Sequence, residues 1–256
     1  MQSSAVSMRS LLRAFSIASK QRVDMADSAL KAEVVLSENN RKTCIEKFKS
    51  FWVPKLPEVA AEAAVLVPLC LYKGELGLLY TLRSMKLTSN RGQVSFPGGM
   101  HDKSDVDLQE TALRETWEEL KIPREKIDVW TTGNLIGKSD VNVMPVLAFI
   151  GEVVPEELEI NPDEVEEAFV VSLQKLCDPE LIRFTSFRQP IVTLPCYTGG
   201  KYRVWGFTGA ITHIALECLV PQVYKYTFSS IQPMQKNHSS EKESVYSDYN
   251  ATHSKI

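Results

Sequence analysis

Three glutamates of this chain fall at positions that one face of a helix would bring together. Residues 107–120 have apolar side chains at helical spacing, and the predicted buried stripe consists of Leu108, Ala112, Leu113 and Trp117. Glu115, Glu118 and Glu119 stand at i, i+3 and i+4, so their carboxylates project side by side and repel one another. Divalent cations would relieve this repulsion, because Mg²⁺ takes oxygen ligands and links carboxylates to substrate phosphates. The spacing therefore predicts either a metal site or a solvated acidic face.

A glycine-rich turn just before this helix favours the metal site. Gly98 and Gly99 follow Pro97 at the end of a short predicted strand, residues 94–96. Glycines allow tight backbone geometry and a close approach of ligand, so the backbone carbonyl of Gly98 is a candidate metal ligand. Arg114 precedes the first glutamate, and we expect its guanidinium to orient a carboxylate by a bidentate contact.

The rest of the body mixes short strands with two further helices. Residues 37–51 and Gly206–Leu219 are predicted to be helical. Strands are predicted at residues 63–67, 76–81, 143–150, 168–172, 191–194 and 202–205. The first two strands are joined by a turn at Lys73-Gly74-Glu75. Strands mixed with embedded helices, without an internal repeat, indicate a compact α/β sandwich and not a regular β-α-β series.

The segment from Phe96 to Ile122 resembles the signature of the Nudix hydrolase family, the Nudix box. Arg114-Glu115 and Glu118-Glu119 match the box in identity and spacing. The segment departs from the box in four ways. One extra residue lies between Gly99 and Arg114, and the box's upstream Glu is absent, with only Asp105 and Asp107 nearby. Thr116 stands where the box has an aliphatic residue, and Lys121 where it has a late glycine. These departures leave open a Nudix-derived binding module with weak catalysis, although the intact glutamates argue against it.

The extra loop residue and a second motif resemble the coenzyme A diphosphatase branch of the family. That branch pairs Leu-Leu-x-Thr-x-Arg-Ser with Gly-x-Val-x-Phe-Pro-Gly-Gly, and both occur here in order, at residues 78–84 and 92–99. The likeness covers about residues 58–223 and is strongest to the mitochondrial members from animals. It implies an α/β fold of the Nudix type, an α/β/α sandwich with a mixed sheet and a catalytic helix, as one domain over residues 58–225.

For the active site, the resemblance implies a divalent cluster of Mg²⁺ or Mn²⁺ that polarises a diphosphate and activates water. Glu118 and Glu119 match the metal ligands, and Glu115 is either a further ligand or the base that positions the attacking water. The backbone of Gly98 would complete the shell, and Arg114 belongs to the same catalytic group. Glu164 or Glu166 is a candidate for a further carboxylate.

The implied reaction splits coenzyme A or an acyl-coenzyme A into 3′,5′-ADP and (acyl-)4′-phosphopantetheine. The phosphates of this substrate need cations, and Arg83, Lys86 and Arg91 are candidates because they flank the box. Arg83 would contact either the 3′-phosphate or the diphosphate. Ser84 and Gly99 complete the predicted substrate-binding set. Within the same family, ADP-ribose or a dinucleotide is the alternative substrate.

Composition excludes several other functions. The formal net charge of -3 gives no general attraction to nucleic acid or to an anionic membrane. The longest apolar stretch, residues 63–72, is interrupted by Pro68 and is too short to span a bilayer. The five cysteines are odd in number and form no Cys-x-x-Cys pair, which favours reduced thiols. His101 is expected at the surface and His213 in the packing of the last helix.

The two ends of the chain differ from the body. Residues 1–23 contain no acidic residue but four cations among apolar and small side chains, which is typical of a mitochondrial transit peptide, so residues 1–35 are predicted to be a targeting leader. Residues 36–57 are predicted to form a helical extension, and residues 226–256 a disordered polar tail. The final Ser254-Lys255-Ile256 differs from a peroxisomal address in its last residue, so peroxisomal and cytoplasmic locations are the alternatives.

Overall fold

A computed structural model describes residues 27–52, 55, 61–138, 140–188, 191–226 and 232–233. Most of the predicted leader, most of the predicted tail and the terminal tripeptide lie outside these residues. No helix within the described ranges is long and apolar enough to cross a membrane.

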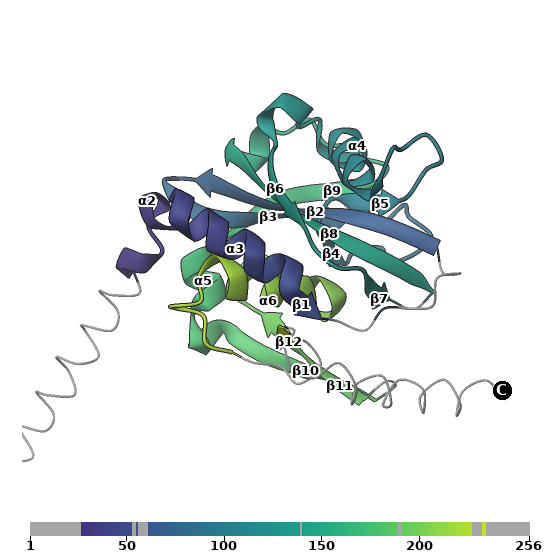
Figure 1. Cartoon of the computed structure of the whole chain (residues 1–256). Helices are drawn as coiled ribbons and strands as arrows, with labels where there is room; N and C mark the ends of the chain where they lie inside the picture. Colours follow the sequence, from purple (N-terminus) through teal and green to yellow (C-terminus); the bar gives the residue numbers. More distant parts are fainter. Residues whose placement is uncertain are drawn as a thin grey trace, which may run out of the picture.

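An eight-stranded mixed sheet forms the centre of the molecule, with the strand order β4-β3-β2-β8-β6 (Figure 1). The hairpin of β2 (Ala61–Tyr72) and β3 (Glu75–Arg83) turns at Lys73 and Gly74, both at positive φ, as the sequence predicted. β2 also pairs in parallel with β8 (Val141–Glu152). The remaining strands of the sheet are β4 (Val94–Ser95), β5 (Gly98–Met100), β6 (Asp128–Thr132), β7 (Ile136–Lys138) and β9 (Val165–Ser172).

Helices cover both faces of this sheet, which confirms the predicted α/β/α sandwich (Figure 1). α4 (Leu108–Leu120) packs on one face, and α3 (Glu38–Ser50), α5 (Leu173–Cys177) and α6 (Gly206–Leu219) lie on the other. β2 contributes to both cores because its side chains alternate: Leu66 faces the α4 side, whereas Val67 faces α3 and α6. A strand buried on both faces reads as a continuous apolar run.

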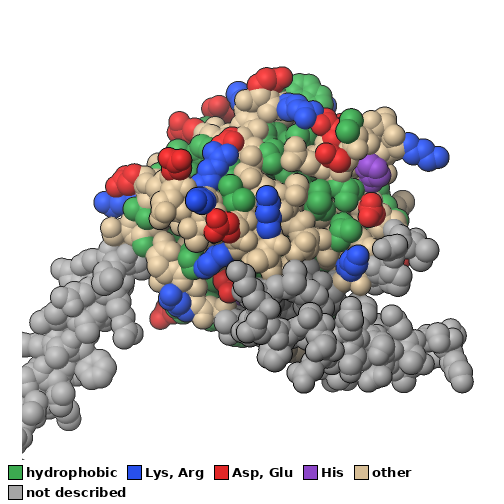
Figure 2. Space-filling view, viewed as in Figure 1, with side chains coloured by type: hydrophobic (Ala, Val, Ile, Leu, Met, Phe, Trp, Pro, Cys, Tyr) green, Lys and Arg blue, Asp and Glu red, His purple; other side chains and the backbone are tan. Residues whose placement is uncertain are grey.

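Smaller elements complete the chain. They are α2 (Ala32–Val35), η1 (Arg124–Lys126), η2 (Pro155–Glu157), η3 (Pro179–Leu181), the pair β1 (Phe51–Trp52) with β12 (Gln232–Pro233), and the hairpin β10 (Ile182–Arg188) with β11 (Ile191–Tyr197). All five cysteines are buried and free, as predicted. The face drawn in Figure 2 carries cations and anions interspersed, without a gathering of one sign.

Three predictions from the sequence are wrong. Gly98 and Gly99 do not lie in a turn but begin strand β5, which pairs with β2. Residues 202–205 do not form a strand, since Val204 makes only an isolated bridge to Tyr197. Trp117 is not in the core: it is 48% exposed, because the buried face of α4 passes through Ala112, Thr116 and Leu120 instead. Thr116 fits this apolar face because its hydroxyl donates to the Ala112 carbonyl at 2.7 Å. An aliphatic residue is therefore not required at this position of the box.

The ends of α4 are set by two charged residues. Asp107 caps the first turn, where its carboxylate accepts the backbone N–H of Glu110 at 2.8 Å. Lys121 ends the helix in the left-handed region, with φ 52° and ψ 27°. The position thus has the backbone conformation for which the box normally uses glycine. The Lys121 ammonium lies 5.5 Å from the centroid of the Trp117 ring and 3.4 Å from the Glu118 carbonyl.

Replacing Lys121 with glycine should raise the free energy of unfolding by less than about 1 kcal/mol. Relief of the left-handed strain is partly offset by loss of the exposed cation contact with Trp117. Lys121→Ala separates the backbone strain from the cation contact, because it removes the charge and keeps the strained left-handed side chain. This variant should be less stable than the parent. Thermal melts of the three proteins test this, and a glycine variant that melts below the alanine variant would contradict it. Turnover should stay within a few-fold of the parent, because Lys121 lies outside the carboxylate cluster.

Candidate active site

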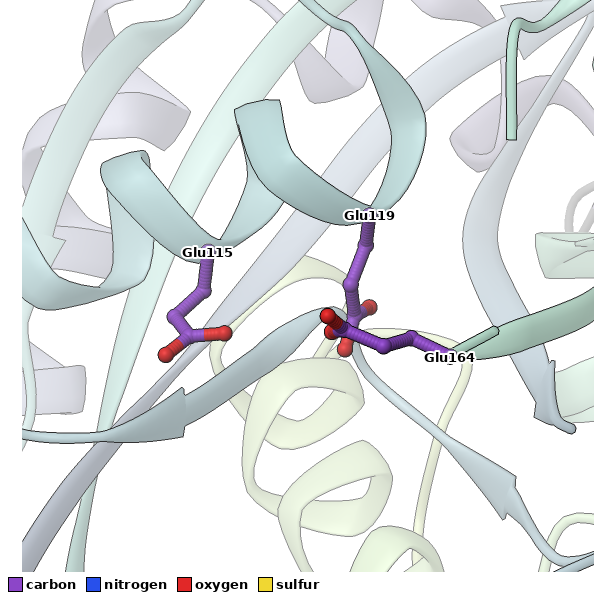
Figure 3. A group of neighbouring side chains, drawn as sticks. All are labelled: Glu115, Glu119 and Glu164. Atoms are coloured by element: carbon purple, nitrogen blue, oxygen red, sulfur yellow. The ribbon is translucent and has the colours of Figure 1, made fainter. Parts of the chain in front are cut away.

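Three carboxylates meet beside α4, at Glu115, Glu119 and Glu164. One oxygen of each lies within 4.8 Å of the others. Figure 3 shows Glu115 and Glu119 on successive turns of the helix and Glu164 reaching toward them from the start of β9. The structure thus brings together two of the predicted glutamates and, of the two candidates for a further carboxylate, Glu164. Glu166 is exposed and outside this group.

Backbone hydrogen bonds hold Glu164 in place. The Asn161 backbone N–H donates to the Glu119 carbonyl at 2.8 Å, which ties the loop before β9 to the end of α4. The Ser84 backbone N–H donates to the Glu164 carbonyl at 2.9 Å, and the Asn161 side-chain amide donates to the Glu164 carboxylate at 3.2 Å. The third carboxylate therefore depends on tertiary contacts of residues distant in sequence.

Glu119 is the most deeply buried of the three carboxylates. Its residue is 2% exposed, and burial raises its pKa to about 8, against the lowering effects of Arg83 and of a hydrogen bond from the Gly98 backbone. Glu115 and Glu164 raise it further by like-charge repulsion. Glu119 Oε2 has no hydrogen-bond partner among the described residues. A divalent cation fits here, because it would pair this oxygen and offset the repulsion among hard oxygen donors.

The two glycines at the start of β5 fit closely against β2 and this cluster. A Cβ on Gly98, whose φ is +152°, would overlap the Ala64 carbonyl and lie 2.6 Å from the Val65 Cα. A Cβ on Gly99 would instead overlap the carboxylate of Glu115. Gly98 is therefore required by the sheet, whereas Gly99 leaves the space in which Glu115 sits.

Arg114 connects the cluster to an aspartate of the same loop. Its Nε and Nη2 donate to the two oxygens of Asp105 at 2.8 and 3.0 Å, and Nη1 donates to Glu115 at 2.9 Å and to Glu118 at 3.1 Å. The bidentate contact expected of Arg114 exists, and its partner is Asp105. Hydrogen bonds from Arg114 hold the pKa of Asp105 well below its usual range. The Glu118 side chain is 44% exposed and lies outside the group of three.

Desolvation also raises the pKa of Glu115, although Arg114 lowers it. The Glu115 side chain keeps 13% of its surface exposed, more open than Glu119 and more enclosed than Glu118. Arg114 holds its Oε1. The arrangement therefore orients one oxygen of this carboxylate and leaves the other available to a ligand or a proton.

A cleft of about 720 Å³ borders Gly98 and Gly99 of β5. Its lining includes Gly98, Gly99 and Arg83 at the carboxylates, Lys138 from β7, and residues of β2, β8, β10 and the start of α6. Arg83 lies close enough to lower the pKa of both Glu119 and Lys138, and its buried Nε has no hydrogen-bond partner among the described residues. Burial is the larger cause of the lowered pKa of Lys138. Two cations thus face this cleft.

The other residues predicted to bind substrate lie elsewhere. Ser84 is 1% exposed, and its hydroxyl donates to the Pro162 carbonyl at 3.1 Å, so it anchors the loop that carries Glu164. Arg91 is exposed and does not line the cleft. Lys86 pairs with Asp163 at 2.8 Å on the surface. His101 is exposed and bonds to Thr111, and His213 is buried against Tyr224, both as expected.

Two residues of the candidate site were not predicted from the sequence. Lys138 had no motif around it, and only the fold brings β7 to the cleft. Asp105 was noted only for its place near the missing upstream glutamate. A signal for it existed, because a short acidic side chain in the lengthened loop before Arg114 is a plausible partner for a guanidinium.

Comparison with known proteins agrees with this geometry. The model of the NUDIX domain matches residues 61–194, and the chain belongs to the Nudix family. It is a Nudix hydrolase, an enzyme class that acts on pyrophosphate bonds. Among curated relatives it is similar to the mitochondrial coenzyme A diphosphatases NUDT8 of Mus musculus and Homo sapiens, 43% identical in both cases over 64% of this chain. The alignments cover 81% and 72% of those proteins.

A third relative is the peroxisomal coenzyme A diphosphatase NUDT7 of Mus musculus. It is 37% identical over 62% of this chain and 70% of its own length. The similarity to proteins named coenzyme A diphosphatases agrees with the branch that the two motifs indicated.

Proposed function

We propose that this Nudix hydrolase cleaves the diphosphate bond of coenzyme A or an acyl-coenzyme A, giving 3′,5′-ADP and (acyl-)4′-phosphopantetheine. The observation that carries the proposal is the cluster of Glu115, Glu119 and Glu164 beside Gly99, a residue that lines the same cleft as Arg83. Arg83 belongs to the Leu-Leu-x-Thr-x-Arg-Ser motif, which supports coenzyme A over other substrates of the family. The names of the relatives support the same substrate.

The cluster would hold Mg²⁺ or Mn²⁺ through Glu115, Glu119 and Glu164, with the backbone of Gly98 as a further candidate. Glu118 would join after a rotation away from Arg114. A bound divalent ion supplies charge to polarise the diphosphate and to lower the pKa of water. The unpaired Glu119 Oε2 and the mutual repulsion of the carboxylates are what make the site suitable for such an ion.

The side chains of the protein have separate tasks in this proposal. Glu115, with Oε1 fixed by Arg114, uses Oε2 either as a metal ligand or to orient the attacking water and accept its proton. Arg83 holds the diphosphate oxygens through charge-assisted hydrogen bonds. Asp105 keeps Arg114 extended along the helix, so that the guanidinium positions Glu115 and does not enter the cleft.

A substrate panel separates this function from its rival in the same family. The purified chain is incubated with coenzyme A, acetyl-coenzyme A, dephospho-coenzyme A, ADP-ribose and NADH, each with Mg²⁺ or Mn²⁺, and products are identified by mass. We expect kcat/KM to be highest for coenzyme A or its thioester. A higher kcat/KM for ADP-ribose or NADH would contradict the proposal and show that the enzyme hydrolyses a different Nudix substrate.

The binding-module alternative rested on Thr116 and Lys121. Thr116 satisfies its own hydroxyl within the buried face of α4, and Lys121 adopts the left-handed conformation of the usual glycine. Neither departure displaces a carboxylate. These observations favour a catalytic protein, and hydrolysis in the panel tests it.

Arg83→Ala should lower kcat/KM for coenzyme A and for dephospho-coenzyme A by the same factor, about 10- to 100-fold. The reason is its position next to Glu119, which suits the diphosphate that both substrates share. Lys86→Ala is the matched control, because it removes a surface cation paired with Asp163, and its activity should stay near the parent. A decrease in kcat/KM for coenzyme A alone would show that Arg83 contacts the 3′-phosphate and not the diphosphate.

For localisation we propose mitochondrial import through residues 1–35, with a peroxisomal location as the alternative. The basic leader without acidic residues supports the first, and relatives named mitochondrial and peroxisomal support both. A fluorescent reporter fused behind residues 1–35 should enter mitochondria. A reporter that stays in the cytosol would contradict mitochondrial import through residues 1–35.

A further inference from the structure

Two aromatic rings with parallel planes line the cleft. Phe187 of β10 and Trp205, the residue before α6, are parallel to within 3°, and their ring centroids lie 6.5 Å apart. A third flat ring inserted between two others needs about 7 Å, twice the contact distance of carbon atoms, so the pair would open by about 0.5 Å to admit one. Trp205 is 40% exposed, so its ring is accessible to a ligand in the cleft.

The cleft brings charged and aromatic groups together. Arg83, Lys138, Phe187 and Trp205 all line it. The Lys138 ammonium lies 5.4 Å from the centroid of the Phe207 ring, two residues after Trp205. Lys138 has no ion-pair partner among the described residues, so it is available to an anion.

We infer that Phe187 and Trp205 hold the adenine ring of the substrate between them and that Lys138 pairs with the phosphate on the adjoining ribose. This inference rests on the proposed function for the identity of the ligand. The groups that line the cleft match those of a 3′-phosphoadenosine diphosphate: Arg83 for the diphosphate, Lys138 for the ribose phosphate, and the ring pair for the base. The pantetheine end has neither a flat ring nor a second phosphate, so it extends away from the ring pair.

Trp205→Ala tests the ring pair, with Trp205→Phe as the matched control that keeps an aromatic face. We expect Trp205→Ala to raise the KM for coenzyme A and the Kd for 3′,5′-ADP about 5- to 100-fold, with a smaller change in kcat. Trp205→Phe should stay within a few-fold of the parent. Binding of 3′,5′-ADP and of 4′-phosphopantetheine is measured by calorimetry with Mg²⁺, and only the first should weaken. Thermal melts establish that both variants are folded.

Lys138→Gln tests the phosphate contact independently. It should raise the KM for coenzyme A about tenfold and leave dephospho-coenzyme A nearly unchanged, because only the first carries the ribose phosphate. Equal effects on both substrates would overturn this contact.

The outcomes distinguish failure of the inference from failure of the proposed function. A folded Trp205→Ala variant that binds 3′,5′-ADP as tightly as the parent overturns the ring pair, even if the parent hydrolyses coenzyme A. A parent that spares coenzyme A and hydrolyses ADP-ribose overturns the proposed function and with it the role of Lys138. In that case the base site still stands if Trp205→Ala weakens binding of ADP.

Discussion

Replacing Glu119 with glutamine should lower kcat for coenzyme A by about a hundredfold or more and leave the chain folded. A neutral amide binds Mg²⁺ far more weakly than a carboxylate, and Glu119 is the cluster member with the least access to water. Glu166→Gln is the matched control, since Glu166 is exposed and outside the cluster. Near-normal turnover of Glu119→Gln at saturating Mg²⁺ would remove Glu119 from the site.

The same substitution should stabilise the protein when metal is removed by a chelator. The pKa of Glu119 is raised from 4.5 to about 8 in the folded state, so folded protein retains a proton that the unfolded chain releases between these pH values. Stability from this group is therefore fully present below about pH 4.5 and is lost as the pH rises through about 8. Glutamine carries no such proton. Above pH 8 the variant should exceed the parent by on the order of 2 to 4 kcal/mol, and the difference should shrink toward pH 4.5.

Chemical denaturation of both proteins across this pH range, with chelator present, measures the difference. A parent that is as stable as Glu119→Gln at every pH would show that the carboxylate is not destabilised by its surroundings. Glu118→Gln serves as comparison, because its half-exposed side chain should give a smaller gain. A loss of turnover in Glu118→Gln as large as in Glu119→Gln would show that Glu118 joins the metal shell.

Alanine at the two glycines of the Pro97-Gly98-Gly99 segment should affect different properties: stability at Gly98 and turnover at Gly99. Gly98→Ala should lower the free energy of unfolding by on the order of 3 kcal/mol or more, because its Cβ meets backbone atoms of Ala64 and Val65 and its φ of +152° disfavours a side chain. Gly99→Ala should change stability by less than about 1 kcal/mol, because its Cβ meets only the movable end of Glu115. Its kcat should nevertheless fall about tenfold or more, as Glu115 is displaced.

Denaturation and steady-state kinetics on the two variants test this pair together. Each variant is the control for the other, since both add one methyl group to neighbouring positions. Gly98→Ala with parental stability would contradict the close packing of Gly98 against β2. Gly99→Ala with parental turnover would contradict the close packing of Gly99 against Glu115.

The fold could be predicted from the sequence wherever local pattern and motif agreed. The β2 and β3 hairpin, α3, α4 and α6 followed from apolar spacing and turn residues. Trp117 was placed in the core because it follows Leu113 by four residues, but Thr116 occupies that face through a hydrogen bond that no hydrophobic pattern reveals. Strands β6 and β10 were not predicted, since their mixed polar and apolar residues show pairing only once β8 and β11 are in place.

Helical spacing predicted only the part of the site that lies on α4, where Glu115 and Glu119 share a face. Glu164 was one of two candidates for a further carboxylate, and tertiary packing brings it to the cluster. Lys138 was not predicted, because only the fold places β7 at the cleft. Helical spacing also grouped Glu118 with the others. It could not show that Arg114 would draw that side chain outward, or that Ser84 would be used to anchor a loop.

Product analysis by mass spectrometry tests the central claim most directly. Coenzyme A is incubated with the parent and with Glu119→Gln, each at saturating Mg²⁺ and again with excess chelator. The proposed function predicts equal amounts of 3′,5′-ADP and 4′-phosphopantetheine from the parent with metal, and at least about a hundredfold less of both from the variant and from the chelated parent. Intact coenzyme A after incubation with folded, metal-loaded parent would contradict it, as would undiminished cleavage by Glu119→Gln.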